Sequence, residues 1–287
     1  GPIIKDKLFF FFNAEFQRQK TPQPFLFSNY QGDTDQAGID ALRAHLLNQY
    51  GYETGGYLDN TDELKANKFI ARLDWNINKT HKLMFRYSYV DNEAIQPYSS
   101  NNQNLYFYNS GRIFPSKTNS GSLELKSHWN KFSNSLLVGF TSVFDDRDPL
   151  GSDFPTIRLS DGGADIYIGS EPYSTANQLK QNILTITDNF TFYKGAHTIT
   201  VGANFEYYDV YNLFIRKNFG EYRWDAVTDF MNGDQAPYYD RSYSMVDDVV
   251  GDGSKAAAEF KVYQIGFYGQ DEWQAKENFK LTFGLRL

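Results

Sequence analysis

Histidine is the side chain best suited to acid–base chemistry and metal binding near neutral pH, and this 287-residue chain has four, His45, His81, His128 and His197. They lie far apart in the sequence. Neither the His-Glu-x-x-His spacing of zinc proteases nor the Gly-x-Ser-x-Gly elbow of hydrolases is present. Cysteine is absent, which excludes a thiolate metal site. A serine–histidine pair across strands stays open, but the sequence predicts no enzyme, no catalytic residue, no metal site and no cofactor.

Carboxylates gather at two places where they could bind a hard cation. The first is Asp145-Asp146-Arg147-Asp148 with Asp153, and the second is Asp247-Asp248 with Asp252. Calcium takes about 6–8 oxygen ligands. Neither spacing matches an EF-hand loop, and Arg147 competes for the charge in the first cluster. We interpret both clusters as solvated acidic loops.

Long polar stretches of the chain carry aromatic residues that could stack on a sugar, a peptide or a chelated metal. These rings are Tyr98, Tyr106, Phe107, Tyr108, Tyr222, Trp224, Tyr238 and Tyr239. An equally good interpretation is that they pack loop against loop. In the first such stretch, Ile39, Leu42, Leu46 and Leu47 have helical spacing. This predicts a short helix over residues 39–50 that stabilises its loop.

The overall composition is both aromatic and polar. Phe, Trp and Tyr make up 17% of the residues, yet the mean hydropathy is −0.56. A membrane-spanning helix needs about 18 or more apolar residues in a row, and the longest run here is Leu8 to Phe12. Barrel strands reconcile the two facts, because only every second residue must face lipid. The net charge of −7 argues against nucleic acid as a partner.

Apolar residues at alternate positions predict about nine strands. The last two, residues 265–273 and 279–286, form a hairpin with Trp273 beside its turn. The other seven are predicted at residues 8–17, 69–77, 83–89, 123–126, 136–144, 182–192 and 199–207.

Short and long connections alternate between these strands. Polar turns are predicted at residues 78–81, 130–133, 193–196 and 274–278, and long loops at residues 18–67, 92–117, 146–179 and 212–260. Several structureless loops of this length are rare in a compact soluble domain. Short periplasmic turns and long extracellular loops are typical of outer-membrane barrels. The sequence therefore predicts an all-β, antiparallel up-and-down transmembrane β-barrel.

Each predicted strand has two chemically different faces. We expect the apolar face to meet outer-membrane lipid and the polar face to line the lumen. The predicted lipid-facing or interfacial aromatics are Phe10, Phe12, Trp75, Phe85, Tyr87, Trp129, Phe140, Phe190, Phe192, Phe205, Phe267, Trp273 and Phe283. The predicted lumen-facing charges are Arg72, Asp74, Arg86, Glu124 and Lys126.

Hairpin register must keep these faces consistent, since a slip of one residue reverses every side chain. A three-residue turn predicts Asn78 opposite Lys82 and Asp74 opposite Arg86. A four-residue turn predicts Trp129 opposite Asn134. Rings also cluster near the turns, at Trp75, Trp129, Phe132, Tyr193, Trp273 and Phe279. Such rings suit the headgroup level of a bilayer, although they could also cap the end of a soluble barrel core.

Several of these segments resemble a known family. Residues 1–11, Gly-Pro-Ile-Ile-Lys-Asp-Lys-Leu-Phe-Phe-Phe, resemble the turn after an early barrel strand in TonB-dependent outer-membrane receptors of the Oar-like group. Tyr268-Gly269-Gln270-Asp271-Glu272-Trp273 with residues 281–286 resembles a mid-barrel hairpin of that superfamily, as does Asp188-Asn189-Phe190-Thr191 with residues 195–199 and Gly202.

The resemblance implies a 22-stranded barrel that encloses an N-terminal plug and receives energy through a TonB box. We then expect residues 1–287 to be part of one barrel domain, about nine or ten strands, without the plug and the closing strands. The implied function is uptake of a scarce large solute such as a siderophore, oligosaccharide or peptide across the outer membrane of a Gram-negative cell. The implied partners are outer-membrane lipid, TonB through the plug, and an unknown extracellular solute.

Two readings from other classes stay open. The barrel could be a surface adhesin or assembly protein that recognises partners with its long loops and transports nothing. Alternatively, the chain could be a soluble carbohydrate-binding β-domain whose aromatic face is interior.

Overall fold

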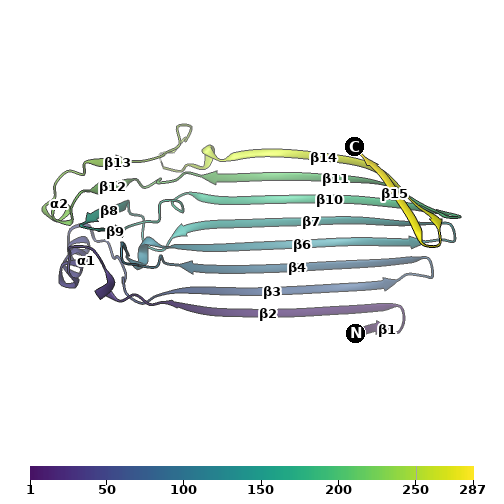
Figure 1. Cartoon of the computed structure of the whole chain (residues 1–287), viewed down its shortest axis with the longest axis horizontal. Helices are drawn as coiled ribbons and strands as arrows, with labels where there is room; N and C mark the ends of the chain where they lie inside the picture. The colour runs from purple at the N-terminus through teal and green to yellow at the C-terminus, as the bar shows by residue number, and fades with distance from the viewer. Residues whose placement is uncertain (250) are drawn as a thin grey trace.

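A computed structural model describes residues 1–249 and 251–287. Ten strands form one long sheet, and each strand pairs antiparallel with the next strand of that sheet along the chain (Figure 1). In spatial order they are β1 (Pro2–Ile4), β2 (Leu8–Gln23), β3 (Asn60–Asn76), β4 (His81–Gln96), β6 (Arg112–His128), β7 (Phe132–Pro149), β10 (Asn177–Lys194), β11 (His197–Phe214), β14 (Ala258–Lys276) and β15 (Phe279–Arg286). The predicted up-and-down topology is confirmed. The sheet is open, with β1 and β15 at its edges.

The strands extend well past the ends predicted for them. β3 begins at Asn60 rather than Phe69, and β4 continues to Gln96 rather than Tyr89. Backbone pairing therefore outlasts the apolar alternation from which the strands were predicted. The four predicted long loops are shorter as a result, and residues 145–148 belong to β7 rather than to a loop. The interpretation of that acidic cluster as a loop was wrong.

Both predicted hairpin registers were wrong by two residues. Asp74 lies opposite Met84, and it is Arg72 that lies opposite Arg86. The side chain of Asn78 accepts hydrogen bonds from the backbone N–H groups of Thr80 (2.8 Å) and His81 (2.9 Å), which places Asn78 inside the turn.

In the next hairpin, Trp129 lies opposite Phe132 rather than Asn134, because Asn130 and Lys131 alone form the turn. The ring centroids of Trp129 and Phe132 are 4.7 Å apart across it. A shift of two residues preserves the side of the sheet on which each side chain lies, so the predicted division into two faces survives both errors.

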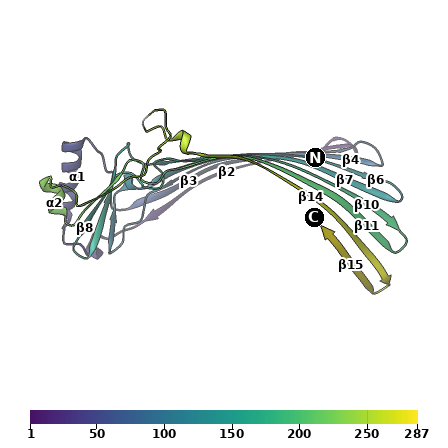
Figure 2. The same ribbon diagram turned by 90° about the horizontal axis from the view of Figure 1, so that it is seen from above.

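The long connections fold into a second, smaller structure at one end of the sheet, which we call the loop domain (Figures 1 and 2). It has a five-stranded sheet in the order β13-β12-β8-β9-β5, with parallel pairing of β12 to β8 and of β5 to β9. Its elements are β5 (Asn104–Tyr106), β8 (Thr156–Asp161), β9 (Ala164–Ile168), β12 (Glu221–Trp224), β13 (Tyr238–Asp240), α1 (Gln36–Tyr50) and α2 (Val227–Asn232). Short 3-10 turns lie at Phe27–Asn29, Tyr108–Ser110 and Ser254–Ala256.

The buried apolar core lies in the loop domain rather than in the large sheet. Ile39, Leu42 and Leu46 of α1 pack with Leu159 of β8 and Ile166 of β9, all fully buried. The predicted helix is confirmed; it begins after Asp35, whose side chain accepts a hydrogen bond from the N–H of Gly38. It ends at Gly51, which has a positive φ of 65°. No helix that the structure describes is long and apolar enough to cross a membrane.

Candidate functional site

The large sheet presents the thirteen predicted lipid-facing aromatics on a single face, which we call the apolar face. Directly paired residues point to the same side of a sheet. Phe10 pairs with Leu73, Leu73 with Phe85, and Phe85 with Leu123, so one row of apolar side chains crosses four strands. These rings and chains are solvent-exposed here, with Phe12 59% exposed and Phe267 60% exposed. That lipid covers this face stays a prediction.

The apolar face is mainly apolar over the half of each strand nearest the turns, where Asp188 accepts a hydrogen bond from Asn134 and Asp271 contacts His197. Beyond that half, the same face carries charges, including the ion pairs Lys20–Glu63 (2.5 Å) and Lys65–Glu93 (2.9 Å). On β11 the apolar stretch runs from Ile199 to Tyr207. At roughly 3.3 Å per residue this is about 26 Å along the strand, close to the ~25 Å apolar band of outer-membrane barrels. We call this stretch of the apolar face the apolar band.

Aromatic rings border the apolar band at both ends. At the turn end, Trp129, Phe132 and Phe190 follow one another at centroid distances of 4.7 and 5.5 Å. At the other end, the rings of Phe69 and Tyr89 stack at 6.3 Å, and those of Tyr207 and Tyr263 meet at 5.0 Å on β11 and β14. The sequence pointed only to the row near the turns. The other row marks the depth at which the charges begin.

The opposite side of the large sheet, which we call the polar face, carries all five predicted lumen charges. Two ion pairs form along single strands, Arg72–Asp74 (2.6 Å) and Lys126–Glu124 (3.0 Å). Arg86 borders a shallow concavity of about 280 Å³ whose other lining residues are mostly Ser, Thr and Gly. Small polar side chains in the middle of this face leave room above it. That the face lines a lumen stays a prediction.

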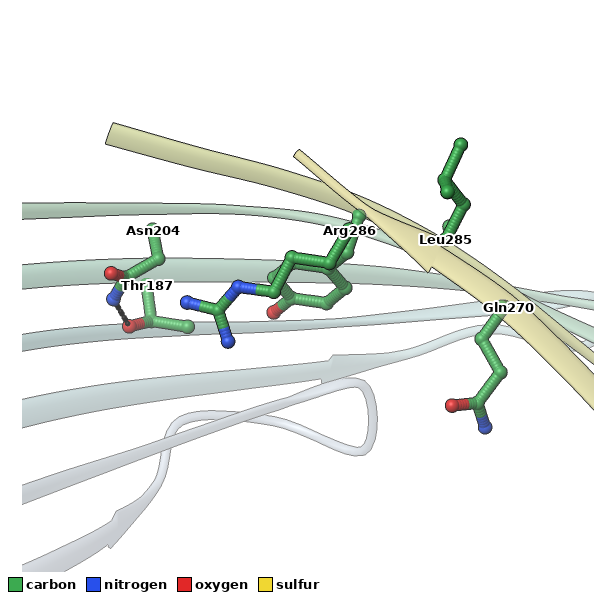
Figure 3. Close-up of a pocket in the computed structure, with 8 residues that line it drawn as sticks. Thr187, Asn204, Gln270, Leu285 and Arg286 are labelled. Carbon is green, nitrogen blue, oxygen red and sulfur yellow. Dashed lines mark hydrogen bonds between the residues drawn. The ribbon is translucent and has the colours of Figure 1, made fainter. Parts of the chain in front are cut away.

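A second hollow on the polar face lies over β10, β11, β14 and β15, with a volume of about 510 Å³. Figure 3 shows Arg286 directed toward Thr187 and Asn204, which are joined by a 2.9 Å hydrogen bond, while Leu285 points away. The Arg286 guanidinium lies 5.8 Å from the ring centroid of Tyr268.

Glycine makes room for this arrangement. The Tyr268 ring lies directly over Gly202, where any Cβ would collide with it, and its hydroxyl donates a hydrogen bond to Asn189. Tyr268 belongs to the predicted hairpin, but its position over Gly202 depends on the register of β11 and β14.

The structure brings none of the histidines into a shared reactive site. His81 contacts the Ser127 hydroxyl at 2.7 Å, and His197 contacts the Asp271 carboxylate at 2.7 Å. Within the described residues no group of three or more His, Cys, Asp or Glu side chains is arranged to hold a metal ion. In the second acidic cluster, Asp247 accepts a hydrogen bond from the Gly253 N–H and Asp248 pairs with Lys255.

The loop domain gathers three of the eight predicted loop rings around one apolar cavity of about 570 Å³. Tyr222 and Tyr239 meet at a centroid distance of 4.5 Å, and Trp224 meets Phe230 of α2 at 5.0 Å. The indole N–H of Trp224 donates to the backbone carbonyl of Asp234 (2.9 Å). We call this hollow the aromatic cavity.

The other predicted rings have different surroundings. Phe107 is fully buried in the core of the loop domain, and Tyr98 contacts Tyr106. Sequence reasoning missed three further rings on the aromatic cavity, Tyr50, Phe154 and Phe230. They come from three different loops, and no spacing in the chain connects them.

A nearly buried ion cluster supports the loop-domain sheet near this cavity. The Lys217 ammonium contacts Glu221 (2.5 Å) and Asp240 (2.8 Å), and Arg223 donates to Glu221 (2.6 Å). Burial alone would raise the pKa of Glu221, but the hydrogen bonds from Arg223 and Lys217 outweigh it and hold that pKa below its ordinary value. The Glu221 carboxylate is therefore charged near neutral pH.

Comparison with known proteins identifies related folds. A family model described as an outer membrane beta barrel domain matches residues 30–287. Among solved structures, the outer membrane transporter YddB from Escherichia coli is similar with a TM-score of 0.58 at 13% identity, over 96% of this chain and 31% of that one.

A mutant of the ferric enterobactin receptor PfeA from Pseudomonas aeruginosa gives a TM-score of 0.56 at 11% identity, over 100% and 35% of the two chains. The siderophore receptor PirA from Acinetobacter baumannii gives 0.51 at 13% identity, over 100% and 34%. The chain thus spans about a third of the length of these structures. At these identities the likeness shows the fold alone. No curated protein matches the sequence.

Proposed function

The chain belongs to the outer membrane beta barrel domain family, and from this we propose that it forms part of the barrel wall and the extracellular loops of a TonB-dependent receptor for a scarce, large solute. A protein of this family is located in the outer membrane of Gram-negative cells. In the proposed arrangement the apolar band contacts lipid and the short turns face the periplasm. The loop domain projects from the cell surface.

The observation that carries the proposal is the change of chemistry along the apolar face. Pairs such as Lys20–Glu63 and Lys65–Glu93 would be costly at the depth of lipid tails. Both of these Lys–Glu pairs lie on the half of the sheet next to the loop domain, whereas the half nearest the turns is mainly apolar on this face. This change along the strands supports the proposal that each strand leaves the bilayer and continues into water. There the strands carry the loop domain.

The polar face supports transport over simple attachment. Arg72, Arg86 and Glu124 lie on the side that a closed barrel would turn inward, and the Ser- and Thr-lined concavity leaves space beside them. In a receptor of the proposed kind these charges would hold a plug or line the passage. The loop domain would contact the solute first, and no catalytic residue is required.

Family membership argues against the soluble carbohydrate-binding alternative, but a surface adhesin shares this architecture. Binding to TonB distinguishes the adhesin from the receptor without knowledge of the solute. We expect the full-length protein, reconstituted in nanodiscs, to bind the purified periplasmic domain of TonB. A measurement by biolayer interferometry, with empty nanodiscs as the control, checks this. If the full-length protein shows no binding above that control, the transport proposal fails and the adhesin is favoured.

A further inference from the structure

One side chain from each strand of the loop-domain sheet forms a continuous row across the sheet. The members, in spatial order, are Tyr238 (β13), Arg223 (β12), Arg158 (β8), Tyr167 (β9) and Tyr106 (β5), and every neighbouring pair is in direct register. We call this row the tyrosine–arginine ladder. Because paired residues point to the same side, all five side chains lie on the face opposite the buried core.

Rings and guanidinium groups contact one another in three of the four neighbouring pairs of the ladder. The Arg223 guanidinium lies 4.4 Å from the Tyr238 ring centroid, and the Arg158 guanidinium lies 5.7 Å from that of Tyr167. Tyr167 and Tyr106 stack at 4.7 Å with an interplanar angle of 17°. Four strand spacings of roughly 4.8 Å make the row about 19 Å long. This is a long, shallow platform rather than a pocket.

The charges of the ladder are already compensated. Arg158 donates to Asp165 (2.7 Å), and Arg223 donates to Glu221 (2.6 Å). A phosphate or sulfate would meet a carboxylate beside each guanidinium, which disfavours a polyanion. Each guanidinium has five N–H donors, so some of them stay free to bond a neutral acceptor. Burial raises the pKa of both Tyr106 and Tyr167, so their hydroxyls are protonated near neutral pH.

The ladder is accessible to a ligand. The side chains of Arg158 and Arg223 are 34% and 37% exposed, and Tyr238 is 41% exposed. At its β5 end the row continues through Tyr98 to Arg112 of β6, whose guanidinium lies 6.0 Å from the Tyr98 ring centroid. Arg112 lies on the polar face of the large sheet. The platform therefore adjoins the face that the proposed function assigns to the passage.

We infer that the tyrosine–arginine ladder is a binding platform for a neutral, linear oligosaccharide that lies across the five strands. Neighbours within the row cover the ring faces, so the ladder presents ring edges and phenol hydroxyls. The hydroxyls of successive sugars would bond these phenols, the free guanidinium N–H groups and the neighbouring carboxylates. A linear β-1,4-linked chain would follow a straight row about 19 Å long. This inference rests on the proposed function, in which the loop domain meets the solute, and names the class of that solute.

Adjacent residues of β13 give a matched test. Tyr238 belongs to the ladder, whereas Tyr239 points to the other side of the sheet and lines the aromatic cavity. Both are exposed, so Tyr238→Ala and Tyr239→Ala should have similar effects on folding. The binding of cellohexaose to the full-length protein in detergent is measured by isothermal titration calorimetry. We expect Tyr238→Ala to weaken binding roughly tenfold, the loss of one direct contact, and Tyr239→Ala to change it by less than about twofold.

Salt concentration supplies the second readout. Binding of a neutral glycan to compensated charges should be nearly independent of salt, whereas a polyanion such as heparin should bind weakly or not at all. Absence of cellohexaose binding to the wild-type protein would overturn the inference, as would binding that is stronger for heparin and falls steeply with salt. A loss confined to Tyr239→Ala would also overturn it, because the solute would then occupy the aromatic cavity. The TonB binding test is independent of all these results.

Discussion

Phe85 and Arg86 are neighbours in β4 whose side chains lie on opposite faces of the large sheet. If the apolar band meets lipid, Phe85→Arg places a charge near the bilayer midplane and should cost about 2–4 kcal/mol, enough to block barrel assembly. Heat-modifiable gel mobility of outer-membrane fractions measures assembly. Ser88→Arg, on the polar face of the same strand, is the matched control and should assemble normally. The reverse ranking would contradict the assignment of the faces.

At this scale the sequence predicted the side of each residue but not its partner. Strict alternation is enough to place Phe85 and Arg86 on opposite faces, because side-chain direction has a period of two. The partner depends on where the turn closes. The Asn78 side chain fixes the position of the turn by accepting hydrogen bonds from Thr80 and His81. With the turn at that position, Arg86 lies opposite Arg72 rather than opposite Asp74. The spacing of apolar residues carries no information on that choice.

Among the elements, the sheet of the loop domain depends on a charged group, Glu221 of β12. Its pKa is lowered in the folded protein, so the stability it contributes is fully present above its ordinary pKa of 4.5 and is lost as the pH falls through the folded value. We expect the loop domain to melt at lower temperature as the pH falls below about 4.5. Glu221→Gln should be less stable by about 2 kcal/mol at pH 7 and less dependent on pH.

The fluorescence of Trp224 reports this melting when every other tryptophan of the protein, including Trp75, Trp129 and Trp273, is replaced by Phe. Asp234→Asn is the control, because Asp234 is an exposed carboxyl of the same domain and forms no ion pair within the described residues. An unchanged pH profile in Glu221→Gln would contradict the assigned role of this carboxylate.

The strands of the large sheet were predictable, whereas those of the loop domain were not. In the large sheet, hairpin partners are adjacent in the sequence and share one apolar pattern. In the loop domain, β5 pairs parallel with β9 and β12 with β8, and the strands are only three to six residues long. Segments this short, paired with strands from distant loops, are too short to show a periodicity of apolar residues. Only α1, with its apolar residues at helical spacing, was visible in advance.

The whole molecule combines two structures with different means of stabilisation. The loop domain buries its own apolar side chains, whereas the large sheet exposes rings such as Phe12 and Phe267 in a band bordered by aromatics and charges. No second layer of the described chain covers that band in either view (Figures 1 and 2). An exposed apolar surface of this extent calls for a covering medium. The alternation of apolar residues predicted the band. It did not predict the limit of the band away from the turns, because charges replace aromatic residues there within strands that continue without a break.

The most direct test of the account measures what covers this band. Residues 1–287 contain no cysteine. Once any cysteine elsewhere in the full-length protein is replaced by Ser, Phe85→Cys, Arg86→Cys and Glu93→Cys each provide one spin-label site in lipid vesicles. Electron paramagnetic resonance then compares accessibility to oxygen, which concentrates in lipid, with accessibility to a water-soluble nickel chelate. We predict that the label at residue 85 favours oxygen, whereas the labels at 86 and 93 favour the chelate, although 93 shares the face of 85. Equal chelate accessibility at 85 and 93 would contradict the account.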